Sequence, residues 1–202
     1  MLMKKILVIV VAMFVLASSA SAQSALGNFI KDSATKLLDQ ATDGKVSELL
    51  LVGSWTYNTP ALDLVSTNTV ANLAGSALTS AVEGKLQKAY DSVGIKQGSC
   101  AFTFNNDNTF SATIGKLSLA GCYTYDSSTH AIELQFDTKI INIPQMKGTA
   151  YVEGDGLKLL FDCTRLMNFV SALGAKSTLL KPVTSLLSSY ENALIGFSLV
   201  KN

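Results

Sequence analysis

The sequence is poor in the residues that most often carry catalysis or bind nucleic acids. Its 202 residues include a single arginine, Arg165, and a single histidine, His130. Arginine forks dominate the recognition of phosphates and base edges, and a formal net charge of +1 provides no basic surface for them. One histidine without a neighbouring cysteine supports neither a metal site nor a histidine-activated nucleophile. The composition therefore argues against nucleic acid as a partner, and it predicts a non-enzyme with no catalytic residues, no metal and no cofactor.

Cysteine is also scarce. Cys100, Cys122 and Cys163 are odd in number and widely spaced, which fits neither a disulfide framework nor a zinc motif. We interpret them as small buried hydrophobic residues, and a single bridge stays open as an alternative if the compartment is oxidising.

A hydrophobic run at the N-terminus is too short to span a membrane. Two lysines precede the apolar residues 6–16, and small residues follow them, as in a cleaved export signal. The run is about half of the roughly 20 residues that a bilayer-spanning helix needs. The first cysteine is Cys100, so the signal lacks the cysteine to which a lipid would be attached. We therefore expect residues 1–22 to be removed, and residues 23–202 to form one exported, periplasmic domain without a membrane span.

The first half of this domain combines helical and strand-like periods. Residues 24–43 carry apolar side chains at helical spacing and predict an N-terminal helix. Residues 49–58 alternate around Trp55 and predict the first strand, which Pro60 ends. Residues 61–93 return to steps of three and four, and predict one long helix or two short ones. This helical insertion either covers the core or acts as a lid over a barrel mouth.

The second half is a run of short strands that ends in helices and one more strand. Alternating apolar and polar residues separated by turn residues predict strands at 99–104, 109–115, 117–125, 130–137, 146–153 and 157–163, with a short one near 138–143. Loops this short join antiparallel neighbours. Thr164 is expected to cap the first of two helices within residues 164–192, and residues 193–200 alternate again as a last strand.

The first and last strands are separated by the whole domain, which is what the closure of a barrel requires. If residues 49–58 pair with residues 193–200, no strand edge is left exposed. The strands number eight or nine, and eight is the size at which side chains fill a barrel or leave room for one small ligand. The sequence therefore predicts a mainly β fold, an antiparallel up-and-down barrel of about eight strands with helical additions.

The start of the first strand carries a recognisable signature. Gly53-Ser54-Trp55 resembles the Gly-x-Trp signature of the lipocalin-like (calycin-type) barrels. The order of signal, helix, Gly-Ser-Trp-Thr-Tyr, Ala-rich helical insertion and a hairpin with Phe-Thr-Phe-x-x-Asp-x-Thr-Phe resembles an uncharacterised family of exported lipocalin-like proteins from Bacteroides-group bacteria. The chain differs from typical lipocalins in two respects. A helical segment replaces the lid loop after the first strand, and two helices precede the last strand.

The resemblance implies a structural role for Gly53 and Trp55. In this class the tryptophan plugs the closed end of the barrel and packs against a basic residue from late in the chain. Arg165 and Lys201 are the two candidates, and Arg165 is the better stacking cation.

The remaining question is what the barrel does. The aromatic residues of the strands are either packed core or the lining of an apolar pocket, for which Phe102, Phe104, Tyr123 and Phe136 are the candidate ligand contacts. Glu133 is on the polar face of its strand and is expected to point outward. The sequence favours a non-catalytic envelope protein that binds a small apolar or amphipathic molecule, such as a lipid. The alternative is a filled barrel that serves as a structural or protein-interaction module.

Overall fold

The computed structural model describes residues 50–65, 71–137, 145–153, 155–188, 190 and 192–202. The predicted export signal at 1–22, the helix at 24–43 and the short strand near 138–143 lie outside these residues. Within the described part of the chain, no helix combines the length and apolarity needed to span a membrane.

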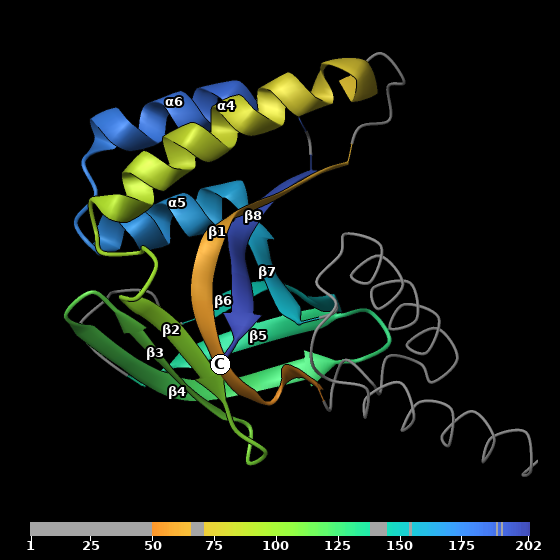
Figure 1. Cartoon of the computed structure of the whole chain (residues 1–202), viewed down its shortest axis with the longest axis vertical. Coiled ribbons are helices and arrows are strands. Elements are labelled where there is room, and N and C mark those ends of the chain that lie inside the picture. Colours follow the sequence, from red (N-terminus) through yellow and green to blue (C-terminus); the bar gives the residue numbers. More distant parts are fainter. Residues whose placement is uncertain (1–49, 66–70, 138–144, 154, 189, 191) are drawn as a thin grey trace, which may run out of the picture.

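Eight antiparallel strands form a closed barrel in sequence order, which confirms the predicted fold (Figure 1). The strands are β1 (Gly53–Val65), β2 (Cys100–Phe104), β3 (Thr109–Ile114), β4 (Leu117–Asp126), β5 (Ala131–Phe136), β6 (Gln145–Glu153), β7 (Gly156–Asp162) and β8 (Asn192–Lys201). The described helices are α4 (Ala71–Asp91), α5 (Cys163–Ala172) and α6 (Ser177–Leu187). Closure comes from β1 and β8, which pair from Trp55 and Lys201 to Val65 and Asn192.

The first strand is longer than the sequence predicted. Pro60 does not end it, because β1 continues to Val65 and Pro60 itself pairs with Phe197 of β8. Beyond Thr56, β1 has only β8 as a strand neighbour, since its pairing with β2 stops there. A proline is tolerated at such an edge because one row of backbone groups has no ladder partner. Residues 61–65 are therefore strand, and the described remainder of the insertion, which begins at residue 71, holds one helix, α4.

The two late helices lie where they were predicted, but their first cap differs. The side chain of Asp162, and not that of Thr164, accepts a hydrogen bond from the backbone N–H of Arg165 at 3.1 Å. Asp162 is the last residue of β7, so one residue ends the strand and begins α5. After α5, Gly174 takes a φ of 106°, which glycine adopts without strain, and the chain turns into α6.

The barrel has two different ends. Short turns after β2, β4 and β6 lie at the end where β1 begins and β8 finishes, and we call this the turn end. The opposite end, where β1 and β7 finish and β8 begins, lies beneath α4, α5 and α6, and we call it the helix end (Figure 1). Apolar residues from the strand interiors and from all three helices belong to one hydrophobic core.

Candidate functional site in the barrel interior

Aromatic side chains fill the centre of the barrel around Phe197. The ring centroid of Phe197 lies 5.4 Å from that of Tyr90, 5.6 Å from Phe102, 6.2 Å from Tyr57 and 6.3 Å from Phe161. These rings come from four strands and from α4, because strand alternation points every second side chain inward. Contacts at these distances, mostly edge-on or tilted, are the arrangements that aromatic pairs prefer.

The four predicted ligand contacts belong to one continuous series of rings. Phe102 stacks on Phe104 at 6.5 Å, and Tyr123 meets the edge of Phe104 at 5.2 Å. Phe136 joins this series through Phe110, whose ring is 5.4 Å from Phe136 and 6.3 Å from Phe104. The Tyr123 hydroxyl donates to the carbonyl of Asn105 at 2.9 Å, in the turn between β2 and β3.

The interior side chains leave almost no surface for a ligand. A cavity that holds a small molecule also has room for a sphere of the size of a water molecule, whether or not water enters it, so its lining side chains keep an accessible fraction. Phe104 and Phe197 are each 1% exposed, Phe102 is 4% exposed and Tyr123 is 5% exposed. Of the four candidate contacts, Phe102, Phe104 and Tyr123 are therefore buried among other side chains, whereas Phe136 is only half-buried.

The helix end is closed by rings and by hydrogen bonds from α4. The Tyr90 hydroxyl donates to the carbonyl of Gly196 at 3.1 Å, and both groups are buried. The Tyr57 hydroxyl donates to Oε1 of Gln87 at 2.9 Å, and Gln87 in turn donates to Asp91 at 2.8 Å. Burial raises the pKa of both phenols, so that they remain protonated donors. The helical spacing of apolar residues in the sequence identified Tyr90, whereas no sequence pattern indicated that Gln87 would accept a hydrogen bond from Tyr57.

Two thiols at the helix end are poorly suited to chemistry. Burial raises the pKa of Cys100 to about 12 and that of Cys163 to about 11, with Asp162 contributing to the second. Both therefore remain thiols at neutral pH, and a thiol is a weak nucleophile. All three cysteines are free, and Cys122 is exposed, which corrects the expectation that each is buried.

The turn end is closed by Trp55 and Lys201. Trp55 is 1% exposed and its indole N–H donates to the carbonyl of Leu51 at 2.8 Å. The Lys201 ammonium lies 5.1 Å from the Trp55 ring centroid, within the range of a cation–π contact. Lys201 thus takes the position that the sequence favoured for Arg165, which is exposed in the first turn of α5.

Gly53 is required at this end for two reasons. Its φ of 136° is one that other residues rarely adopt, and a Cβ there would lie 3.1 Å from Cε of Lys201. The glycine of the Gly-x-Trp signature therefore leaves room for the lysine that covers the tryptophan.

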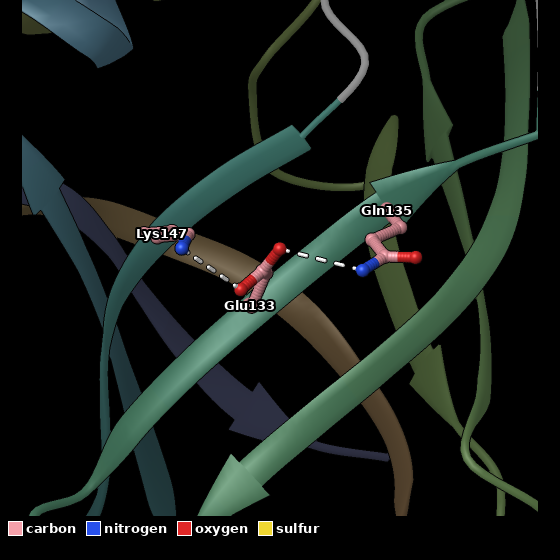
Figure 2. Close-up of polar contacts among 3 residues, drawn as sticks. All are labelled: Glu133, Gln135 and Lys147. Atoms are coloured by element: carbon pink, nitrogen blue, oxygen red, sulfur yellow. Dashed lines mark hydrogen bonds and ion pairs between the residues drawn. The ribbon is translucent and has the colours of Figure 1, made fainter.

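The polar face of the barrel is solvated. Lys147 and Glu133 form an ion pair at 3.3 Å between β6 and β5, and Gln135 donates to Glu133 at 3.3 Å (Figure 2). His130 lies in the turn before β5, half-buried, with its Nδ1 2.9 Å from the Tyr125 hydroxyl. Among the residues that the structure describes, no three His, Cys, Asp or Glu side chains are grouped so that they could hold a metal ion.

An eight-stranded up-and-down barrel with Gly-x-Trp at the start of its first strand and a cation over the tryptophan defines a lipocalin-like protein. The chain belongs to the family described as Lipocalin-like domain (DUF4923), which matches residues 26–201 and confirms the resemblance noted in the sequence. A comparison with curated proteins finds no match.

Among solved structures, the chain is similar to a DUF4847 family protein from Bacteroides vulgatus ATCC 8482. The two share 13% sequence identity, with a TM-score of 0.38, over 78% of this chain and 97% of that chain. A similarity this loose adds nothing about function.

Proposed function

We propose that this protein is an exported, non-catalytic lipocalin-like barrel with a filled interior, and that it serves as a structural or protein-interaction module of the cell envelope. The observation that carries this proposal is the packing around Phe197, whose ring meets four others inside the barrel. A side chain occupies the position that a bound molecule takes in a ligand-carrying barrel. Function then resides on the outer surface and the covering helices.

A catalytic role has little support in the same residues. The interior thiols have raised pKa values, about 12 for Cys100 and about 11 for Cys163, and the interior phenols are engaged as hydrogen-bond donors. General acid–base or nucleophilic catalysis needs a group whose pKa lies near the working pH.

The second candidate function is the binding of a small apolar molecule at the helix end. It is favoured by the position of α4, which lies directly over Tyr57 and Phe197 and is fastened there through Tyr90 and Gln87. A movement of α4 would expose an aromatic surface that continues to Phe102, and from there to Phe104, Tyr123 and Phe136. In this role α4 would be a lid over the barrel mouth, one of the two roles expected for the helical insertion after the first strand.

Native mass spectrometry of the protein isolated from the cell envelope without detergent tests both candidates. We expect the barrel to carry no lipid and to occur partly in a protein complex of fixed stoichiometry. A lipid or other apolar molecule bound at one copy per chain would contradict the filled barrel and support the second candidate. A chain that carries neither lipid nor protein partner would count against both.

A further inference from the structure

The exposed charges at the turn end of the barrel are mostly negative. The turns after β2, β4 and β6 each expose one aspartate, namely Asp107, Asp126 and Asp155. Hydrogen bonds from the side chains of Thr109 and Ser128 hold the pKa values of Asp107 and Asp126 below the ordinary 3.8. Both carboxylates are therefore ionised at neutral pH. Lys201, a cation at this end, is held over the tryptophan ring.

The helices at the opposite end expose lysines instead. Lys85 and Lys88 are exposed one turn apart on α4, Lys181 is exposed on α6, and Lys176 is exposed directly before α6. We call these four residues the basic helix face. The helices α4 and α6 pack against each other, with the end of α4 and the start of α6 on the same side of the layer (Figure 1). The four lysines therefore belong to two adjacent antiparallel helices.

Few acidic side chains oppose this charge. Glu83, Gln87 and Asp91 form one row along α4. The row borders the barrel, because Gln87 bonds to Tyr57 of β1 and Asp91 accepts a hydrogen bond from Gln87. Glu83 is half-buried, so Asp91 is the one exposed acidic side chain within the bounds of the three described helices. Arg165 of α5 adds a further exposed cation, and the layer is positive overall.

Lys176 occupies a position that does not favour a lysine. It is the N-cap residue of α6 and makes no side-chain hydrogen bond to the helix. Serine, threonine, aspartate and asparagine are preferred there because their oxygens accept from the free N–H groups, and the positive end of the helix dipole repels a cation. A residue that opposes the local preference in this way indicates a role on the surface and not in folding.

The exposed surface of the helix layer lacks the apolar anchors of a protein interface. Of the large apolar side chains that the structure describes, only Val200 is exposed, and it lies on β8. The exposed residues near the lysines are short, such as Ala81 and Gly84 on α4 and Ser185 on α6. Protein interfaces depend on buried aromatic and arginine anchors. An anionic lipid surface attracts lysines through its field alone and needs no such anchor.

We propose that the basic helix face docks the protein onto a membrane surface rich in anionic lipids, with the turn end pointing away from it. The lysines lie at the lipid headgroups, and the same surface repels the aspartates of the turn end, so the charge distribution orients the barrel. Docking at the helix end leaves the sides of the barrel accessible to a protein partner. This inference goes beyond the proposed function and does not depend on whether the barrel interior is filled.

Sedimentation with lipid vesicles tests the proposal on the purified protein. We expect binding to vesicles of equal parts phosphatidylcholine and phosphatidylglycerol at low salt, and none to vesicles of phosphatidylcholine alone. Binding should be lost at about 1 M salt, where charges are screened beyond about 3 Å. Failure to bind the anionic vesicles at low salt, or equal binding to both kinds of vesicle, would overturn the proposal.

Paired substitutions locate the binding face at constant net charge. We expect Lys85→Gln with Lys181→Gln to weaken binding to the anionic vesicles at least about tenfold, since each lysine near the surface contributes to the attraction. Lys147→Gln with Lys158→Gln, on strands β6 and β7 at the side of the barrel, is the matched control and should change binding less than about threefold. Equal weakening by the two pairs would contradict a defined face. Circular dichroism checks that all four substitutions leave the fold intact.

Fluorescent labels test the orientation. In a Cys122→Ser background, which removes the exposed native thiol, an environment-sensitive label is attached to Ser185→Cys on α6 or to Ser128→Cys in a turn of the turn end. We expect the emission to change on anionic vesicles for the label on α6 only. Equal changes at both positions, or a change at the turn end alone, would contradict docking through the helices.

An acidic protein is the other class of partner that lysines could bind. Polyglutamate serves as its probe. Binding to polyglutamate that is lost in the Lys85→Gln, Lys181→Gln variant, together with no binding to the anionic vesicles, would assign the basic helix face to a protein and overturn the proposal.

Discussion

The two ends of the barrel are closed by different physical means. At the turn end, Trp55 and its cation Lys201 lie opposite each other on the paired strands β1 and β8, so a single register brings them together. At the helix end, closure depends on α4, α5 and α6, which pack through rings such as Tyr90 and Phe169. The turn end is therefore a local feature of two strands, whereas the helix end exists only when the whole fold is assembled.

The centre between the two ends should be the most sensitive to change. We expect Phe197→Ala to lower the free energy of unfolding by about 3–5 kcal/mol, because it removes a ring that meets four others and leaves a cavity. Urea unfolding measures this loss. Val200→Ala on the exposed face of the same strand is the control, with an expected change within about 0.5 kcal/mol. Similar effects of the two substitutions would contradict a packed interior.

The helix end should depend on the buried hydroxyl of α4. We expect Tyr90→Phe to destabilise the fold by about 1–2 kcal/mol, since it removes the donor to the Gly196 carbonyl while keeping the ring contacts. Tyr151→Phe on the outer face is the control and should have a smaller effect. If Tyr90→Phe is neutral in urea unfolding, α4 is held by its apolar contacts alone.

Removal of the cation at the turn end should lower the free energy of unfolding by less than the substitutions of Phe197 and Tyr90 do. Lys201→Gln is expected to cost about 0.5–1 kcal/mol, the strength of a cation–π contact at an exposed site. The fluorescence of Trp55, the single tryptophan of the chain, should change in Lys201→Gln and be preserved in Lys201→Arg. A loss as large as that of Phe197→Ala would show that the turn end is not a local feature.

The smallest effect on stability is expected for a substitution in the exposed turn between β4 and β5, at the turn end of the barrel. The Ser128 hydroxyl, followed by the Ser128 backbone N–H, holds the pKa of Asp126 near 2, below the ordinary 3.8. Because the folded pKa is the lower one, this stabilisation is present above pH 3.8 and is lost as the pH falls towards 2. Ser128→Ala should raise the pKa of Asp126 towards its ordinary value, which a carboxyl titration by nuclear magnetic resonance detects. An unchanged titration would mean that the hydrogen bonds from the backbone N–H groups alone keep the pKa of Asp126 low.

The barrel itself could be predicted because its signals are short-range and repeated. Alternation identified β2 to β8 within one or two residues, and the separation of the first and last strands indicated closure. Pro60 misled the prediction of β1, since its tolerance depends on how far β2 runs beside β1, which only the assembled sheet shows. The choice between Thr164 and Asp162 as the cap of α5 depended in the same way on where β7 ends.

The sequence predicted which aromatic residues point into the barrel, but not how their rings pack there. Phe102, Phe104, Tyr123 and Phe136 were identified as interior residues from alternation alone, and their rings do form one series. Whether such a set is core or pocket depends on what fills the space between the rings. Phe197 of the last strand packs against Phe102, and Tyr90 of α4 packs against Phe197. No local pattern in the sequence predicts that these residues from distant segments are in contact.

The same limit explains the partner of Trp55. Arg165 was favoured on chemistry, because arginine stacks better on a ring. Lys201 is the partner because the β1–β8 register places it directly opposite Trp55, while Arg165 follows β7 at the helix end. Position in the sheet therefore outweighed the intrinsic preference of the side chain.

The central claim is that the interior is filled and closed at both ends, and crystals of the protein under xenon pressure test it most directly. Xenon enters apolar cavities that water leaves empty. The packing around Phe197 predicts no ordered xenon inside the barrel. Xenon bound between Phe102, Phe104 and Tyr123 would contradict the filled interior and reveal a ligand cavity inside the barrel.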